Sequence, residues 1–168
     1  IYFQPQLNVN SGAIEGMEAL LRWRHEQLGI VSPGDFIPIA EESGLIHQLG
    51  EWVIREVCRQ IKLWQSEGYR VPNIAINISA REFGSSHLTR TIRSIIMETG
   101  LDADCLVFEI TESISIHQID SILSTLNDLK EIGVRVAIDD FGKGYSALNY
   151  LKDFPIDILK IDKCFIKD

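Results

Sequence analysis

Polar side chains recur near the carboxyl ends of five apolar, strand-like segments of this chain. The segments span residues 17–23, 74–79, 106–112, 134–140 and 158–162. Their polar members are carboxylates, an amide and a lysine: Glu18, Asn77, Glu109, Asp139 and Lys160. A polar group inside an apolar strand is costly unless a partner satisfies it. Their recurrence at similar places in successive segments therefore predicts one shared site.

The oxygen donors of this set predict a site for hard divalent cations. The carboxylates and the amide offer only oxygen, and oxygen ligands without Cys or His favour Mg²⁺, Mn²⁺ or Ca²⁺ over Zn²⁺. Several carboxylates that converge without a cation would repel one another and become partly protonated. The consecutive Asp139 and Asp140 could bridge two metal ions about 3.5–4 Å apart, as in two-metal phosphoryl-transfer enzymes.

Two cations and a glycine loop complete the predicted chemistry. Arg22 suits bidentate binding of a phosphate, and Lys160 suits holding water or neutralising charge on phosphorus. Segment 141–146 is typical of a mobile cover or a metal-supporting loop. Structural alternatives stay open: Lys160 as an ion-pair partner of Asp162 or Glu109, Arg22 as a support of the site, and the oxygen donors as satisfied strand residues. The histidines share no spacing, and we assign them no role.

Alternation along the strands places the polar residues on one face. Successive side chains of a strand point to opposite faces, so Asn77 shares a face with Ala75, and Glu109 shares one with Val107. Bulky apolar residues such as Phe108 fall on the other face. This pattern predicts a (β/α)₈ barrel of the α/β class, with its active site at the carboxyl ends of the strands. An open doubly wound sheet is the alternative, but its glycine-rich phosphate loop is absent from the sequence.

Helical patterns separate the strand-like segments, as parallel β/α units require. We expect helices over residues 36–44, 46–67, 86–99, 119–132 and 146–153. Ser32 or Asp35 would cap the first of these helices, and Gly44 would end it.

Composition excludes several function classes. The net charge of −8 opposes binding of a nucleic-acid polymer, which needs a basic face. No apolar run reaches the roughly 18 residues of a membrane span, and no signal peptide is visible. The three cysteines form no C-x-x-C pair. We therefore expect buried free thiols and a cytoplasmic protein, rather than a disulfide framework or a zinc site.

Residues 18–23 (EALLRW) resemble the signature of the EAL-domain family of cyclic di-GMP phosphodiesterases, and further motifs similar to those of the family follow at compatible spacing along the whole chain. These motifs occupy residues 3–5, 36–41, 77–79, 109–112, 139–146 and 160–162. The resemblance therefore rests on an ordered series rather than on one tripeptide.

The resemblance implies a role for each site residue. One metal ion would be held by Glu18, Asn77, Glu109 and Asp139. Asp140 would bind a second ion, shared with Asp139. Lys160 would orient the attacking water and stabilise the transition state, and Glu112 would order the loop that carries Asp140. The ligand would contact Arg22, the Leu20 backbone, Gln4 and Asp162.

The resemblance also implies the reaction and its setting. Cyclic di-GMP would be hydrolysed at one phosphodiester to linear pGpG, with two Mg²⁺ or Mn²⁺ ions as cofactors and Ca²⁺ as an inhibitory substitute. We expect a role in bacterial second-messenger signalling, attachment to sensor or cyclase-like domains, and homodimer formation. The cytoplasmic part of a membrane-bound sensor is an equivalent setting.

One departure concerns the length of the chain. A barrel of this type runs to about 250 residues, whereas this chain ends at Asp168, just after the sixth predicted barrel strand. We expect residues 1–168 to be a single EAL-like barrel domain that lacks its last two strands, as an excerpt of a longer protein. The alternative function is a receptor that binds cyclic di-GMP, or a protein, without hydrolysis. An unrelated metal-dependent barrel of the aldolase or enolase type is a third reading.

Overall fold

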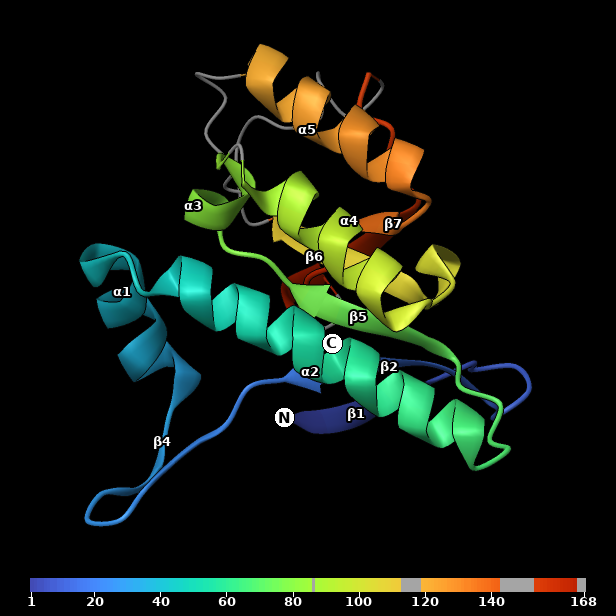
Figure 1. Ribbon diagram of the computed structural model, residues 1–168, viewed down its shortest axis with the longest axis horizontal. Helices are drawn as coiled ribbons and strands as arrows, with labels where there is room; N and C mark the ends of the chain where they lie inside the picture. Colours follow the sequence, from blue (N-terminus) through green and yellow to red (C-terminus); the bar gives the residue numbers. More distant parts are fainter. Residues whose placement is uncertain (86, 113–118, 143–152, 166–168) are drawn as a thin grey trace.

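A six-stranded sheet forms the centre of this computed structural model (Figure 1). The structure describes residues 1–85, 87–112, 119–142 and 153–165. In spatial order the strands are β1 (Tyr2–Leu7), β2 (Ile14–Leu20), β5 (Asn73–Asn77), β6 (Leu106–Thr111), β7 (Arg135–Phe141) and β8 (Ile158–Ile161). β1 is antiparallel to β2, and each later pair is parallel. The sheet curls into half of a barrel, which confirms the predicted fold class over these strands.

Helices cover the outer face of this sheet. They are α1 (Pro33–Ser43), α2 (Ile46–Ser66), α3 (Ala80–Phe83), α4 (Leu88–Thr99) and α5 (Ile119–Ile132), with the 3₁₀ turns η1 (Ala103–Cys105) and η3 (Lys163–Phe165). In Figure 1, α2, α4 and α5 follow one another across the sheet, and α1 packs against α2. The strand–helix alternation expected from the sequence is therefore present.

The core lies between the sheet and these helices. It contains the bulky residues of alternate strand positions, such as Ile76 and Phe108, which are buried. The opposite face of the same strands carries smaller residues, Ala75, Val107 and Ala137, which form a separate buried cluster. The alternation in the sequence thus assigned the two faces of the sheet correctly.

Helix caps explain where α1 and α4 begin or end. Ser32 Oγ accepts a hydrogen bond from the Gly34 amide at 3.3 Å, so Ser32 rather than Asp35 caps α1. Gly44 follows α1 with a left-handed φ of 76°, and Gly100 follows α4 with a φ of 60°. Glycine adopts these angles without steric cost.

The strand predicted over residues 17–23 is wrong at its carboxyl end. β2 ends at Leu20, and Trp23 begins a separate two-stranded sheet of β3 (Trp23–His25) and β4 (Gly29–Val31). The Trp23 ring packs edge-on against Phe36 of α1, with 5.6 Å between ring centres. This contact, which no local pattern reveals, favours a hairpin over continuation of the barrel strand.

The helix predicted over residues 86–99 begins later, at Leu88. The short α3 before it was missed, although Ser79 and Glu82 form the reciprocal capping box of the S-x-x-E signature. The short helix predicted over residues 146–153 lies almost wholly outside the described residues.

The cysteines are free thiols, as expected, but they are not all buried. Cys58 is buried in α2 and Cys105 is partly buried, whereas Cys164 is exposed. Cys164 belongs to the exposed turn η3, so its burial was predicted wrongly. Among the described residues, no helix combines the length and the apolarity that crossing a membrane requires.

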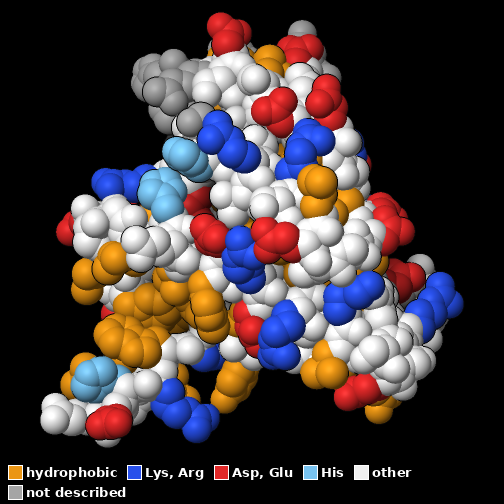
Figure 2. Space-filling model, viewed as in Figure 1, with side chains coloured by type: hydrophobic (Ala, Val, Ile, Leu, Met, Phe, Trp, Pro, Cys, Tyr) orange, Lys and Arg blue, Asp and Glu red, His pale blue; other side chains and the backbone are white. Residues whose placement is uncertain are grey.

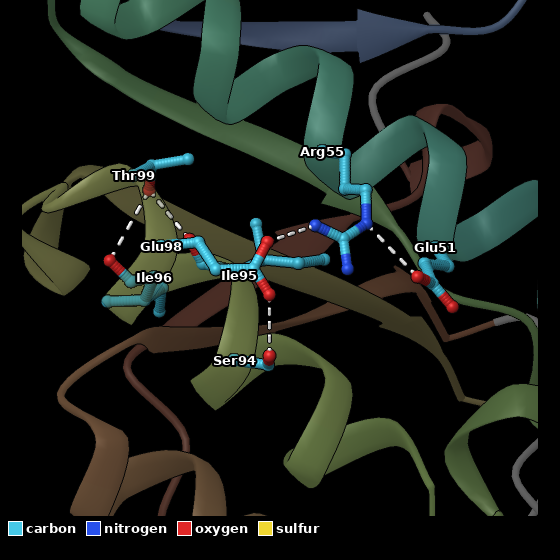
Figure 3. A network of polar contacts seen from close by, with 7 residues as sticks. All are labelled: Glu51, Arg55, Ser94, Ile95, Ile96, Glu98 and Thr99. Carbon is cyan, nitrogen blue, oxygen red and sulfur yellow. Dashed lines mark hydrogen bonds and ion pairs between the residues drawn. The ribbon is translucent and has the colours of Figure 1, made fainter.

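A polar network joins α2 to α4 (Figure 3). Arg55 pairs with Glu51 in its own helix at 3.0 Å and with Glu98 in α4. Ser94 donates a further hydrogen bond to Glu98 at 2.7 Å. Basic and acidic side chains are interspersed over this helical face in Figure 2, and hydrophobic side chains gather over α1.

Candidate functional site

A cluster of three carboxylates surrounds the Lys160 ammonium at the carboxyl ends of the barrel strands. Lys160 Nζ lies 2.7 Å from Glu109 Oε2 and 3.2 Å from Asp139 Oδ2. Glu18 Oε2 lies 3.5 Å from the same nitrogen, and Glu18 Oε1 accepts a hydrogen bond from the Asn77 amide at 2.8 Å. The structure thus brings together the residues that strand alternation predicted to share one face.

Strand register explains why these side chains meet. Asn77 of β5 lies directly beside Glu109 of β6, and Glu109 lies beside Ala137 of β7. Asp139 follows Ala137 by two residues, and residues two apart in a strand point to the same face. Because neighbouring strands lie about 4.8 Å apart, side chains on one face at adjacent strand ends fall within contact distance.

Burial sets the electrostatics of the cluster. The Glu109 side chain is 2% exposed. Burial raises the pKa of Glu109 from 4.5 to about 7, although the hydrogen bond and the charge of Lys160 lower it. Burial lowers the pKa of Lys160, but the hydrogen bond to Glu109 and the carboxylate charges outweigh burial and raise it. The ammonium therefore stays charged at neutral pH, while the Glu109 carboxyl titrates near neutrality.

A β-bulge in β7 carries the two aspartates. The pairing of β7 with β8 shifts between Ile138 and Phe141, where β7 advances three residues against two in β8. Asp140 adopts a left-handed φ of 55°, a conformation that costs a non-glycine residue about 1–3 kcal/mol. Its amide donates a hydrogen bond to Asp139 Oδ1 at 2.9 Å. Bulges of this kind commonly re-aim side chains beside active sites.

Glu112 contacts the backbone on both sides of Asp140. Its amide donates to the Asp139 carbonyl at 3.2 Å, and its Oε2 accepts a hydrogen bond from the Gly142 amide at 2.8 Å. Gly142 has a φ of 99°, which residues with side chains rarely adopt. Glu112 is therefore located where a residue that orders the loop around Asp140 must lie, and its loop-ordering role stays a prediction.

Three of the residues predicted to bind ligand lie around β1 and β2. Arg22 follows β2 and donates to the backbone carbonyl before it at 2.8 Å, and its guanidinium carbon lies 5.9 Å from the centre of the Tyr2 ring. Gln4 of β1 is exposed and lies directly opposite Glu18 in the strand pair. Leu20 is the last residue of β2. Their contacts with a ligand stay predictions.

The carboxylate of Asp162, the fourth predicted ligand contact, accepts a hydrogen bond within its own turn. The residue is buried, and its Oδ1 accepts a hydrogen bond from the Cys164 amide at 2.8 Å. Its own amide donates to the Phe141 carbonyl at 3.2 Å. Asp162 therefore caps the η3 turn and connects that turn to the end of β7.

The donor chemistry of the cluster fits a hard divalent cation. Every donor is a carboxylate or amide oxygen, and the Asn77 amide presents its oxygen when it turns over. In the described residues the carboxylates close on Lys160, and no three His, Cys, Asp or Glu side chains are arranged to hold an ion. A bound ion would therefore compete with the ammonium for the same carboxylates.

The cluster borders a hollow on the inner side of the half-barrel. A cavity of about 340 Å³ is lined by Ala75, Val107, Glu109 and Lys160 among other residues. The small side chains on this face leave space beneath the cluster, so its charged groups face a cavity rather than a packed core.

The glycine loop was interpreted incompletely from the sequence. Segment 141–146 was expected to be a mobile cover or a metal-supporting loop. Its first residue, Phe141, is the last residue of β7, and Gly142 is hydrogen-bonded to Glu112. Residues 143–146 lie outside the described part of the chain. The bulge before them has no sequence signal, because two aspartates followed by Phe-Gly also fit a plain strand-to-loop turn.

Comparisons with known proteins point to one family. The family model described as EAL domain matches residues 1–168. MucR of Pseudomonas aeruginosa, a bifunctional diguanylate cyclase/cyclic di-GMP phosphodiesterase by name, is 44% identical over 168 residues, which are 100% of this chain and 24% of MucR. NbdA of the same organism, named a cyclic di-GMP phosphodiesterase, is 39% identical over 100% of this chain and 22% of its own length.

Solved structures show the same likeness. The PaMucR phosphodiesterase in complex with c-di-GMP matches with a TM-score of 0.91 and 45% identity, covering 98% of this chain and 66% of that one. The FimX EAL domain from Pseudomonas aeruginosa, solved with c-di-GMP bound, has a TM-score of 0.87 at 24% identity, which shows the fold alone. This chain, with the ordered motifs and the strand-end cluster described above, belongs to the EAL domain family.

Proposed function

We propose that this chain carries the catalytic cluster of a metal-dependent phosphodiesterase that hydrolyses cyclic di-GMP to linear pGpG. The observation that supports this function is the set of ion pairs that the Lys160 ammonium forms with Glu109, Asp139 and Glu18. Asn77 is hydrogen-bonded to Glu18 in the same cluster. The cluster lies at the carboxyl ends of barrel strands, where barrel enzymes bind substrate. Relatives with phosphodiesterase names support the choice of substrate.

The proposed cofactors are two Mg²⁺ or Mn²⁺ ions. The oxygen donors of Glu18, Asn77, Glu109 and Asp139 would hold one ion, and Asp140 would join Asp139 in holding the second. Bound ions of this kind polarise a phosphate and lower the pKa of water.

The chain's own residues contribute charge and position. Lys160 is held by three carboxylates, so its charge is in place before the negative charge on the phosphoryl oxygens develops. Arg22 supplies a planar guanidinium for a phosphate of the ligand. The Leu20 backbone, Gln4 and Asp162 would make further ligand contacts, and Glu112 would keep the backbone around Asp140 in place.

The chain spans about a quarter of the length of MucR. We propose that the whole protein carries sensor or cyclase-like domains beside this one, and that it acts in the cytoplasm. Homodimer formation and the single-domain character of residues 1–168 stay predictions.

Hydrolysis of cyclic di-GMP by the full-length protein tests this function. The assay separates cyclic di-GMP from pGpG after incubation with Mg²⁺ or Mn²⁺, and it compares the wild type with Glu18→Ala and Lys160→Ala. Loss of one electrostatic stabiliser typically lowers kcat by about 10²–10³, so both variants should be slower by at least that order. Lys62→Ala is the matched control, because Lys62 is an exposed lysine on the outer helix α2.

Equal rates in all of these proteins would contradict the catalytic assignment. Tight binding of cyclic di-GMP by the wild type without any pGpG would select the receptor alternative.

A further inference from the structure

The backbone after the aspartate pair is held from two sides. On one side, the Gly142 amide donates to Glu112 Oε2 at 2.8 Å. On the other side, the Phe165 ring lies against Gly142: a Cβ built on this glycine would overlap ring atoms Cε2 and Cζ and would lie 3.2 Å from Cδ2. Gly142 therefore permits both the left-handed backbone and the close approach of the ring.

Phe165 reaches Gly142 because the chain turns back after β8. Asp162 Oδ1 accepts a hydrogen bond from the Cys164 amide at 2.8 Å, and the Asp162 carbonyl accepts one from the Phe165 amide at 3.1 Å. The Asp162 amide is bonded to the Phe141 carbonyl at 3.2 Å. The capped turn is thus anchored to the last residue of β7 and returns the aromatic ring to the residue that follows β7.

The position of this contact matters because Asp140 is strained. Its φ of 55° is sparsely populated for a residue with a side chain, and such strain persists when surrounding contacts over-determine the backbone. Phe165 is 62% exposed in this part of the protein, and the edge of its ring lies against Gly142. The segment that carries Lys160 therefore also supports the backbone behind Asp140.

We propose that Phe165 is a positioning residue, which together with Glu112 clamps Gly142 and so keeps Asp139 and Asp140 in place relative to Lys160. Asp162 contributes by capping the turn that presents the ring. This inference rests on the proposed function, because it concerns the placement of residues assigned to metal binding.

Hydrogen exchange of the full-length protein tests the clamp directly. In Phe165→Ala, the peptide covering residues 139–142 should exchange about tenfold faster or more than in the wild type, because the Gly142 backbone loses one support. Mn²⁺ affinity, measured by calorimetry, should fall about 10- to 100-fold, as is usual when the support of a metal ligand is removed. Phe165→Leu keeps an apolar side chain and adds no group at the Cζ position, which lies at the contact, so it should lose less protection and less affinity than Phe165→Ala.

Tyr69→Ala is the matched control, because Tyr69 is a similarly exposed aromatic residue, at 65%, in the loop before β5. Wild-type exchange of residues 139–142 in Phe165→Ala would overturn the proposal. So would an equal acceleration in Phe165→Ala and Tyr69→Ala, since that result would indicate general loosening. If the wild type does not bind Mn²⁺ or cleave cyclic di-GMP, the proposed function fails, while the exchange result still decides the role of Phe165.

Discussion

Replacing Lys160 with methionine removes the ammonium from the carboxylate cluster and keeps a side chain of similar length. In the metal-free wild type, burial raises the pKa of Glu109 from 4.5 to about 7. A raised folded-state pKa means that the contribution of this carboxyl to stability is fully present below pH 4.5 and is lost as the pH rises through about 7. At about 1.4 kcal/mol per pKa unit, ionised Glu109 costs the folded protein about 3 kcal/mol at pH 8.

Without the ammonium, the pKa of Glu109 rises further, because the hydrogen bond and the charge of Lys160 hold it down. A carboxyl that stayed fully protonated at pH 8 would cost about 5 kcal/mol, for about 3.5 units between this pH and the unfolded pKa, and this is the upper limit. The added cost from Glu109 is therefore at most about 1–2 kcal/mol. Glu18 and Asp139 also lose their ion pairs with Lys160. Their side chains are 22% and 25% exposed, so solvent screens these pairs, and each is worth less than about 1 kcal/mol.

Lys160→Met should therefore lower the free energy of unfolding by about 2 kcal/mol at pH 8. At pH 5 the loss should be smaller by about 1–2 kcal/mol, because Glu109 is then protonated in both proteins and its added cost is absent. Urea denaturation in the presence of EDTA at the two pH values measures both quantities. Lys62→Met is the control: it loses one exposed hydrogen bond to the Gly100 carbonyl, so any small change in its stability should be the same at both pH values.

An equal loss of stability at pH 5 and pH 8 would refute this reasoning. Such a result would mean that the packing of the lysine stem, rather than its charge on Glu109, stabilises the strand ends.

Other parts of the structure lead to further predictions. A Cβ on Gly50 would lie 2.8 Å from Cδ of the buried Glu82 and would overlap its carboxyl oxygen, so Gly50→Ala should lower the free energy of unfolding by about 1–3 kcal/mol. Gly84→Ala, which meets only ordinary contacts, should not lower it, and equal effects in chemical denaturation would contradict the steric explanation. Burial raises the pKa of Glu82, so its contribution to stability is present below the ordinary carboxyl pKa and is lost as the pH rises through the raised value. Glu82→Gln should therefore make the free energy of unfolding depend less on pH in a series of denaturation experiments. An unchanged pH dependence would contradict this role of Glu82. Burial raises the pKa of the Cys58 thiol to about 12, whereas Cys164 is exposed, so alkylation of the native protein followed by peptide mass spectrometry should modify Cys164 and spare Cys58. Labelling of Cys58 before unfolding would show that its burial is incomplete in solution.

Strand alternation predicted most of the residues that meet at the site, although it also placed Asp162, which caps a turn, on the face of Lys160. Ala75 and Asn77, or Val107 and Glu109, differ from their bulky neighbours in polarity or size, and the period of two in a strand converts that difference into two faces. A helix cap could also be recognised from the sequence, since Ser32 was a predicted cap of α1 and caps it in the structure. These features depend on neighbours in the sequence, and local patterns therefore report them.

Features that depend on contacts between distant segments were missed. Trp23 leaves the barrel strand because its ring packs on Phe36, and the bulge before Phe141 forms against β8. Phe165 had no assigned role in the sequence, since its contact with Gly142 joins two segments that only the fold brings together.

The sequence by itself determined the kinds of chemical group at the site, the face of each strand on which they lie, and the order of the motifs that resemble the family. Tertiary structure decided how those groups interact. It made Glu109 the buried carboxylate, with a pKa of about 7, and left Glu18 and Asp139 partly exposed. It also placed the Lys160 ammonium within ion-pair distance of all three of these carboxylates, and it placed the Asp162 carboxylate where it caps a turn. The physical reason is that side-chain types and alternation are local properties, whereas burial, ion pairing and backbone strain depend on which distant segments pack against one another.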